Sequence, residues 1–206
     1  MGPVRSRVRQ NLLLMATCLA LGIMSIMTSG PAKADQDPPA AQARLVQQAL
    51  LSAPQARAAT GFTGTLANDE LAGRSCYSSA TAWTCDAWFT TNRYQHPYPS
   101  GVSITVAQDA NSASAELARL AALEPDPNRP GSRVLRSDAS TLIVLTTGFA
   151  VGIDLEPAVT VSVTKVQGRL LVMGTCQVQH KQLKLSRLRA CATKLESAQA
   201  KAAPNM

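Results

Sequence analysis

The chain has 206 residues, including 2 Trp, 3 Tyr and 3 Phe; 16% of the residues are charged, the formal net charge is +7, and the mean hydropathy is +0.00. This length suffices for one domain of ordinary size with a sizeable core. The composition excludes a disordered polar chain, a polytopic membrane protein and a small disulfide knot.

Residues 1–34 have the order of a secretory signal peptide. Three arginines between residues 5 and 9 precede an apolar run over 12–27, and Ala32 and Ala34 supply the small side chains of a cleavage site. This order predicts cleavage after Ala34 and export of the remaining chain. An uncleaved anchor is the alternative, but the run of 16 residues is short for a hydrocarbon core of about 30 Å. We expect no membrane span after cleavage.

Removal of the leader changes the charge balance. Residues 1–34 hold four of the 20 basic residues and no acidic residue, so the mature 172 residues carry 16 basic and 13 acidic groups, a net charge of +3. Much of the basic character of the full chain therefore belongs to the discarded segment. The small remaining charge and the export of the chain argue against nucleic acid as a partner.

Four cysteines remain after cleavage, and an even number in an exported chain predicts two disulfides. Four cysteines allow three connectivities. We favour Cys76–Cys85 and Cys176–Cys191, because each pair forms its own cluster in the sequence. A zinc site is the alternative, but spacings of nine and fifteen residues and the positions of the two histidines do not follow a zinc-ligand pattern.

The first part of the mature chain is expected to form a helix and a hairpin. Asp37 and the two prolines after it predict a helix start, and apolar residues recur at helical spacing until Pro54, where we expect the helix to end. Residues 55–73 have the composition of a loop. The β-branched and aromatic residues between 76 and 94 predict a hairpin that its two cysteines staple across its base.

The middle of the chain is predicted to alternate strands with one helix. Residues 102–106 alternate between apolar and polar side chains, as a half-buried strand does. A helix capped by Asn111 or Ser112 follows, and a proline-rich linker ends it. Residues 134–136 favour a short strand. The run 141–147 is apolar on both faces, which is typical of a central strand.

The last part of the chain contains the clearest hairpin. Valines alternate with polar residues over 159–164, Gln167-Gly168 supplies a tight turn, and the chain returns over 169–176. A closing helix is predicted over 180–199, with a frayed tail at 201–206. These elements predict one α+β domain over residues 35–200, built as a twisted antiparallel sheet with helices on one face and two disulfides.

Several features of residues 100–200 occur together. A hairpin turns near Gly168, Cys176 ends its second strand, Cys191 lies in an Ala- and Leu-rich closing helix, and an earlier strand leads into an Ala-rich helix. This layout resembles the secreted or lipid-anchored sensor-type domains of actinobacteria, including the extracellular sensor of certain mycobacterial serine/threonine kinases. The resemblance implies a non-catalytic ligand-binding or signalling role, with a groove lined by sheet residues. The close spacing of Cys76 and Cys85 departs from the long-range first disulfide that the resemblance implies.

Motifs of secreted hydrolases are missing from the sequence. It contains no G-x-S-x-G and no H-E-x-x-H, and no cysteine stays free if both disulfides form. His96 in a proline-rich loop and His180 at the predicted start of the closing helix are expected to be surface residues. Asp154 and Glu156 are expected to be solvated, with an acid/base pair as the alternative. We expect no enzymatic activity, no metal and no cofactor.

The closing helix carries an uneven share of the positive charge. The cations over residues 181–201 are Lys181, Lys184, Arg187, Arg189, Lys194 and Lys201, and Glu196 is the acidic residue among them. One interpretation is a surface for an anionic partner, such as a cell-wall polymer, an anionic lipid headgroup or an acidic protein. The other is a solvated face whose cations near the helix C-terminus complement the helix dipole.

These observations together favour an exported, non-catalytic binding or sensor-type domain. We expect it to capture a small ligand or a partner at the cell envelope or outside the cell. A secreted hydrolase or an enzyme inhibitor is one alternative. Another is an envelope protein that binds anionic polymers through its basic C-terminal helix.

Overall fold

A computed structural model describes residues 40–61, 67–68, 74–78, 82–90, 100–122, 131–149, 157–179 and 184–205. The predicted signal peptide, the predicted proline-rich linker and residues 91–99 and 150–156 lie outside these ranges. None of the helices within the described ranges is both long and apolar enough to cross a membrane.

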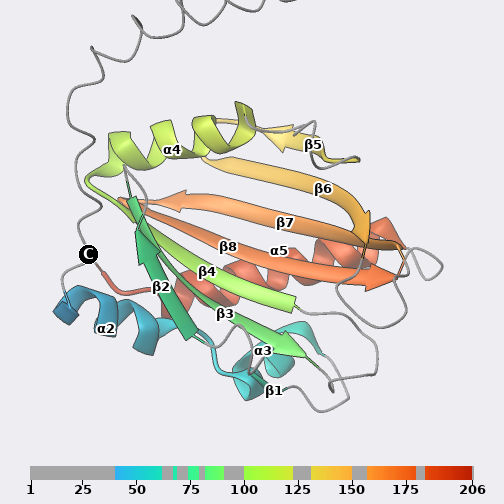
Figure 1. The fold of residues 1–206 in the computed structure, drawn as a ribbon, viewed down its shortest axis with the longest axis horizontal. Helices are drawn as coiled ribbons and strands as arrows, with labels where there is room; N and C mark the ends of the chain where they lie inside the picture. The colour runs from blue at the N-terminus through green and yellow to red at the C-terminus, as the bar shows by residue number, and fades with distance from the viewer. Residues whose placement is uncertain are drawn as a thin grey trace, which may run out of the picture. The chain divides into compact units, whose positions relative to one another are not determined.

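The described strands form a single sheet in which every pairing is antiparallel (Figure 1). Its order is β1-β3-β4-β8-β7-β6-β5, and β2 pairs with β3 beside this path. The strands are β1 (Ala67–Asn68), β2 (Arg74–Ser78), β3 (Ala82–Thr90), β4 (Ser100–Ala107), β5 (Arg133–Ser137), β6 (Thr141–Phe149), β7 (Pro157–Gln167) and β8 (Leu170–Gln179). The described helices are α2 (Ala40–Ala49), α3 (Ala53–Thr60), α4 (Ala110–Ala122) and α5 (Leu185–Ala202).

Helix α5 lies behind the sheet in the view of Figure 1 and covers one of its faces, the α5 face. Alternate residues of the central strands, such as Ile104, Val161 and Val172, are buried there in one cluster with Leu188 and Leu195 of the helix. The same cluster takes in the buried side of α2 and α3. The predicted α+β class and antiparallel sheet are therefore confirmed.

Helix α4 packs against the opposite face of the sheet, the α4 face. Leu142 and Leu171, which alternate with residues of the α5 face, form a second buried cluster with Ala113 and Leu117 of this helix. Because successive strand residues point to opposite faces, α4 and α5 lie on different sides of the sheet. The expectation that all helices pack on one face is wrong in this respect.

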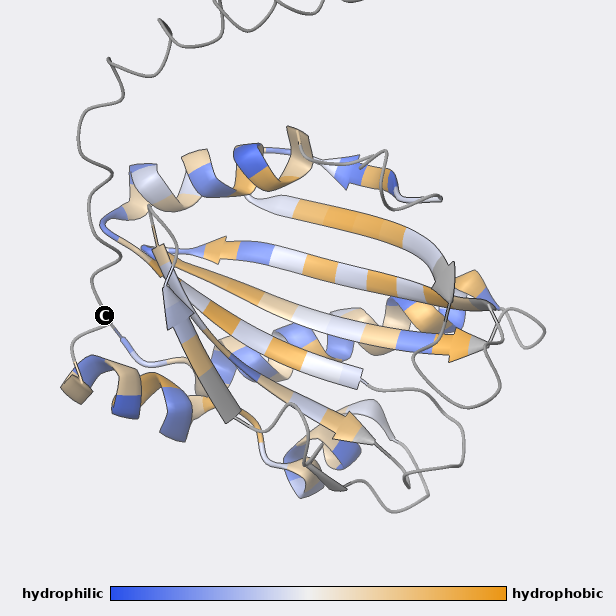
Figure 2. Ribbon diagram, in the orientation of Figure 1, coloured by the Kyte–Doolittle hydropathy of each residue, from blue (hydrophilic) through white to orange (hydrophobic). Residues whose placement is uncertain are grey.

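The apolar run of β6 has a physical explanation in these two layers. Ile143 belongs to the cluster on the α5 face, whereas Leu142 belongs to the cluster beneath α4. Figure 2 shows the resulting uninterrupted hydrophobic stretch in this strand. The strand is not central, however, since its neighbours are β7 and the last strand of the sheet order, β5. Burial on both faces, and not a central position, accounts for the pattern.

A second helix occupies the segment that the sequence pattern predicted as a loop. Pro54 does not end a helix; it stands in the first turn of α3. Ser52 caps this helix, since its Oγ accepts from the Gln55 backbone nitrogen at 3.4 Å while Gln55 Oε1 accepts from the Ser52 nitrogen at 2.8 Å. This capping box and the tolerance of helix starts for proline explain why the chain folds into a helix here.

Two other element boundaries differ from the predicted ones. The cap of α4 is Asp109, whose Oδ1 accepts from the Ser112 nitrogen at 2.7 Å, and not Asn111 or Ser112. The closing helix begins at Leu185 and continues to Ala202, so it enters the predicted tail. Ala202 and Ala203 also pack against the core. The strands predicted at 102–106, 134–136 and 159–176 are present as parts of β4, β5, β7 and β8.

Candidate functional site

Close contact with the sheet holds α5 in place. Gly174 of β8 lies under the helix, and a Cβ atom at this position would overlap the Glu196 nitrogen and the Ala192 oxygen of the helix backbone. The inner side of the helix buries Leu188, Ala192 and Leu195. A glycine in the strand therefore lets the helix backbone approach the sheet directly.

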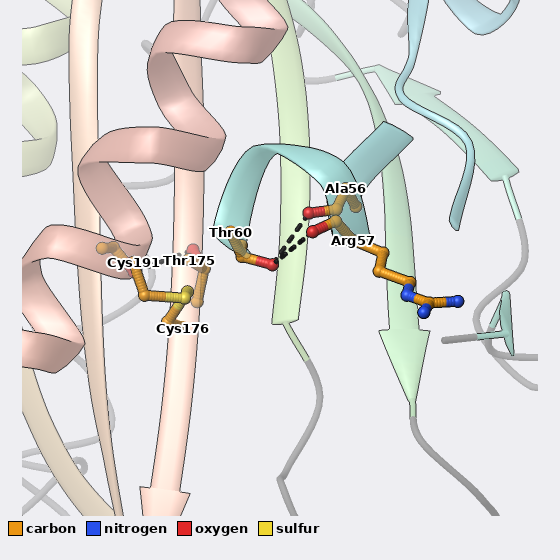
Figure 3. The surroundings of a disulfide bond; sticks show 7 residues. Ala56, Arg57, Thr60, Thr175, Cys176 and Cys191 are labelled. Atoms are coloured by element: carbon orange, nitrogen blue, oxygen red, sulfur yellow. Dashed lines mark hydrogen bonds between the residues drawn. A yellow bond between two sulfur atoms is a disulfide. The ribbon is translucent and has the colours of Figure 1, made fainter. Parts of the chain in front are cut away.

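A disulfide fixes the same helix to the strand below it. Cys176 of β8 and Cys191 of α5 are bonded with a Cα–Cα distance of 6.1 Å (Figure 3). The other disulfide joins Cys76 and Cys85, which face each other across β2 and β3. Both predicted pairs are thus confirmed. The Cys176–Cys191 disulfide connects helix α5 directly to the sheet.

The end of α3 completes the support of α5. Figure 3 shows this end beside the Cys176–Cys191 disulfide, with the Thr60 hydroxyl donating to the carbonyl oxygens of Ala56 at 2.9 Å and Arg57 at 3.3 Å. Gly61 then stops the helix in a left-handed conformation, with φ of 70°.

Polar side chains on the inner side of α5 have structural partners. Glu196 is 2% exposed and accepts from Lys165 Nζ of β7 at 2.6 Å. Gln199, which is fully buried, donates to the Ala49 oxygen at 2.8 Å and accepts from the Leu51 nitrogen at 2.9 Å. These bonds link α5 to β7 and to the α2–α3 junction. Helical spacing alone did not reveal either role, because both residues look like ordinary polar positions in the sequence.

The outer side of α5 carries cations without such partners. Lys184, Arg187, Arg189, Lys194 and Lys201 are all exposed. None of them forms an ion pair or a side-chain hydrogen bond with another residue in the described ranges. Glu196, the acidic residue of the same helix, is buried on the other side beside Lys165. The predicted anionic-partner residue Lys181 lies outside the described residues.

Two described arginines outside α5 have carboxylate partners. Arg119 contacts Glu116 in a bidentate pair at 2.7 and 2.6 Å, and Arg136 contacts Asp138 at 2.7 Å. Hydrogen bonding to Glu116 raises the pKa of Arg119. The α5 cations thus stand out as a cluster of like charges that no nearby carboxylate among the described residues neutralises.

Three of these cations form a line along the helix. Arg187, Lys194 and Lys201 are seven residues apart, which brings them to nearly the same side of an α-helix. We call these three residues the cationic stripe. At a rise of about 1.5 Å per residue the stripe extends over about 21 Å.

The helix dipole does not account for the cations at the start of α5. Lys184 occupies the N-cap position, Arg187 and Arg189 follow within the first two turns, and the first turn has no acidic residue. Positive charges are disfavoured at this end of a helix. Only Lys201 lies in the last turn, where the dipole favours it. The helix dipole therefore favours Lys201 and gives no reason for the cations at the start of the helix.

An open depression lies between α5 and β5. Its volume is about 630 Å³, and one wall is Leu135 of β5. The helix wall consists of two rows of residues four apart: Leu185, Arg189 and Thr193 in the first, and Ser186, Ala190 and Lys194 in the second. We call this depression the α5–β5 groove. Two of the predicted anionic-partner residues, Arg189 and Lys194, line it.

The resemblance implies a groove lined by sheet residues, but Leu135 is the strand residue among the described residues that line the α5–β5 groove. On the α4 face, hydroxyl groups pair across strands: Thr84 with Thr105 at 2.8 Å, and Ser162 with Thr175 at 3.1 Å. These hydroxyls therefore have partners within the sheet. The α5–β5 groove takes one wall from a strand and the other from a helix.

The residues of the alternative hydrolase hypothesis lie outside the described ranges: His96, Asp154, Glu156 and His180. That hypothesis stays a prediction. Within the described part of the chain, no group of three or more His, Cys, Asp or Glu side chains is arranged to hold a metal ion.

Comparison with known proteins finds a distant likeness in structure. No protein-family model and no curated protein matches the sequence. A solved structure titled as the extracellular domain of PknH from Mycobacterium tuberculosis superposes with a TM-score of 0.44 and 11% sequence identity, over 77% of this chain and 96% of that domain. This likeness is weak in structure, and no similarity in sequence accompanies it.

Proposed function

We propose that the mature chain is a non-catalytic binding domain that acts outside the cytoplasm and binds a linear anionic polymer of the cell envelope through α5. The observation that carries this proposal is the set of exposed α5 cations without ion-pair partners among the described residues. Uncompensated like charges on one helix repel each other and cost stability. A polyanion removes that cost when it binds.

The disulfides support the location. Both of them join cysteines of the α5-face core, and disulfides persist in oxidising compartments outside the cytoplasm. The predicted signal peptide over residues 1–34 agrees with this location. A protein at this location has access to the anionic polymers of a cell envelope.

The shape of the charged surface favours a linear ligand. The cationic stripe extends along the helix axis, and each cation lies about 10 Å from the next. A chain with repeated phosphate or carboxylate groups contacts all three side chains at once, whereas a compact anion reaches one or two. Binding at several exposed charges is screened by salt, since the Debye length is about 10 Å at 0.1 M ionic strength.

A salt titration with defined polymers tests this function. The mature, disulfide-bonded protein is measured against immobilised polyphosphate and polygalacturonate, with neutral dextran as the control matrix. We expect binding to both polyanions at low salt and no binding to dextran. The affinity for the polyanions is expected to fall at least tenfold when the ionic strength rises to about 1 M, where the Debye length is about 3 Å. The double charge reversal Lys184→Glu/Arg187→Glu is expected to abolish binding. Equal retention on dextran and polyphosphate contradicts the proposal.

A further inference from the structure

We infer that the α5–β5 groove is a second site, which binds a single-chain anionic amphiphile with its acyl chain in the groove and its carboxylate or phosphate at Arg189 and Lys194. This site goes beyond the proposed polymer surface, since it lies on the neighbouring flank of the helix, beside β5. It shares one residue, Lys194, with the cationic stripe.

The groove exists because one flank of α5 has small side chains. Ser186, Ala190 and Thr193 leave the space between this flank and β5 unfilled. Leu135 and Leu185 are half-buried and pack against the core on the α5 face, so the apolar part of the lining is held in place from below. The depression has a volume of about 630 Å³ and is open to solvent, so a chain would lie along it.

The charged groups stand at the margin of this apolar lining. Arg189 and Lys194 are exposed and have no ion-pair partner among the residues that the structure describes. They are five residues apart, a rise of about 7.5 Å and a rotation of about 140° around the helix, so they flank the groove from opposite margins. The planar guanidinium of Arg189 matches the two oxygens of a carboxylate or phosphate, and Lys194 adds a second positive charge.

Both parts of the site are needed to define its ligand. A small hydrophilic anion leaves Leu135 and Leu185 in contact with water, and a neutral hydrocarbon leaves the two cations without counter-charge. An amphiphile satisfies both, because its chain removes apolar surface from water while its headgroup meets the cations. A fatty-acid carboxylate and a lysolipid phosphate share this chemistry.

Calorimetric titration of the mature, disulfide-bonded protein tests the site. The probes are dodecanoate and dodecyl phosphate below their micellar concentrations, with dodecyl maltoside, acetate and inorganic phosphate as controls. We expect one site per chain for the two anionic amphiphiles and no measurable heat for acetate or phosphate. Binding tightens about fourfold per buried methylene, so octanoate, which is four methylenes shorter, is expected to bind about 250-fold more weakly than dodecanoate if the groove buries all four. Tighter binding of dodecanoate or of dodecyl phosphate supports the site in either case. The preference then shows whether the natural ligand has a fatty-acid carboxylate or a lysolipid phosphate.

Two variants separate the chain pocket from the headgroup contacts. Ala190→Trp fills the groove from an exposed position, and Arg189→Gln removes a charge while keeping a polar side chain. Each is expected to weaken dodecanoate binding at least tenfold. Ala118→Trp, which places the same indole at an exposed position of α4, is expected to leave binding unchanged. Mass spectrometry confirms both disulfides in every variant, and circular dichroism confirms the fold.

The same variants distinguish this site from the polymer surface. Arg187, which does not line the groove, is expected to matter for polyphosphate and not for dodecanoate, so Arg187→Glu weakens only the former. Ala190→Trp is expected to have the opposite effect. Dodecanoate binding that survives both Ala190→Trp and Arg189→Gln, or dodecyl maltoside binding as tight as that of dodecanoate, overturns the inference whatever the result with polymers.

Discussion

Gly174 of β8 and Glu196 of α5 lie in direct backbone contact, since a single added methyl group on Gly174 would overlap the backbone nitrogen of Glu196. This contact lets α5 lie low on the sheet, where its inner side is buried and its outer side presents the cations. The position of the candidate site therefore depends on a residue with no side chain.

Substitution of Gly174 by Ala is expected to destabilise the fold by about 3 kcal/mol, because the overlap is with helix backbone and cannot be relieved by a rotamer change. Chemical denaturation followed by circular dichroism measures the loss. Gly101→Ala is the matched control: the added Cβ would lie 2.7 Å from Cε3 of Trp88, a side-chain atom that is able to move. An equal or smaller loss for Gly174→Ala would show that the helix does not rest on this strand.

Loss of the Lys165 ammonium is expected to destabilise the protein by about 2 kcal/mol, since it leaves the buried Glu196 carboxylate without its counter-charge. Partial exposure of Lys165, 40% of its side chain, keeps this below the cost of breaking a fully buried pair. Lys165→Met tests the effect through the free energy of unfolding. Arg136→Met breaks an exposed pair with Asp138 and is expected to cost less. The reverse order of the two variants contradicts the structural role of Glu196.

Removal of the Cys176–Cys191 disulfide is expected to lower the free energy of unfolding by about 3 kcal/mol, the value for a loop of its length. Because this disulfide also fixes α5 to β8, Cys176→Ala/Cys191→Ala is expected to weaken binding of dodecanoate. Cys76→Ala/Cys85→Ala removes the other disulfide, which joins β2 to β3, and is expected to lower stability without changing that affinity. If both double variants bind dodecanoate equally, the disulfide does not position the groove.

Asp138 gives the fold a measurable dependence on acid. Hydrogen bonds from the Ser140 nitrogen, and then from Arg136, lower the pKa of this carboxyl to about 2. Its contribution to stability is fully present above its unfolded pKa of about 3.9 and is lost as pH falls toward 2. The stability difference between the natural protein and Asp138→Asn is therefore expected to shrink between these two pH values. A difference that stays constant from pH 7 to pH 2 contradicts this assignment.

Much of the sheet was predictable because its signals are local. Alternation of apolar and polar side chains specified β4 and β7, and the separate clusters of cysteines indicated both disulfides. The capping box at Ser52 and Gln55 was also readable, yet the expectation that Pro54 ends a helix obscured α3. The two apolar faces of β6 contained the evidence for helices on both sides of the sheet.

The candidate site was predictable only in its charges. Lysine and arginine on a closing helix are visible in the sequence, and four of the predicted residues are exposed on α5. The groove was not predictable, because its second wall is Leu135, which is 50 residues before Leu185 in the chain and joins it only through the sheet. Small residues such as Ala190 become informative once the opposite wall is known.

The affinity of two charge-reversal variants for polyphosphate tests the central claim most directly. Arg187→Glu and Arg44→Glu change the net charge equally and replace exposed arginines on different helices, α5 and α2. We predict that Arg187→Glu weakens binding at least fivefold at low salt, whereas Arg44→Glu changes it by less than twofold, as expected for a surface localised on α5. Equal losses for the two variants would mean that polyphosphate senses only net charge, and would contradict a binding surface on α5.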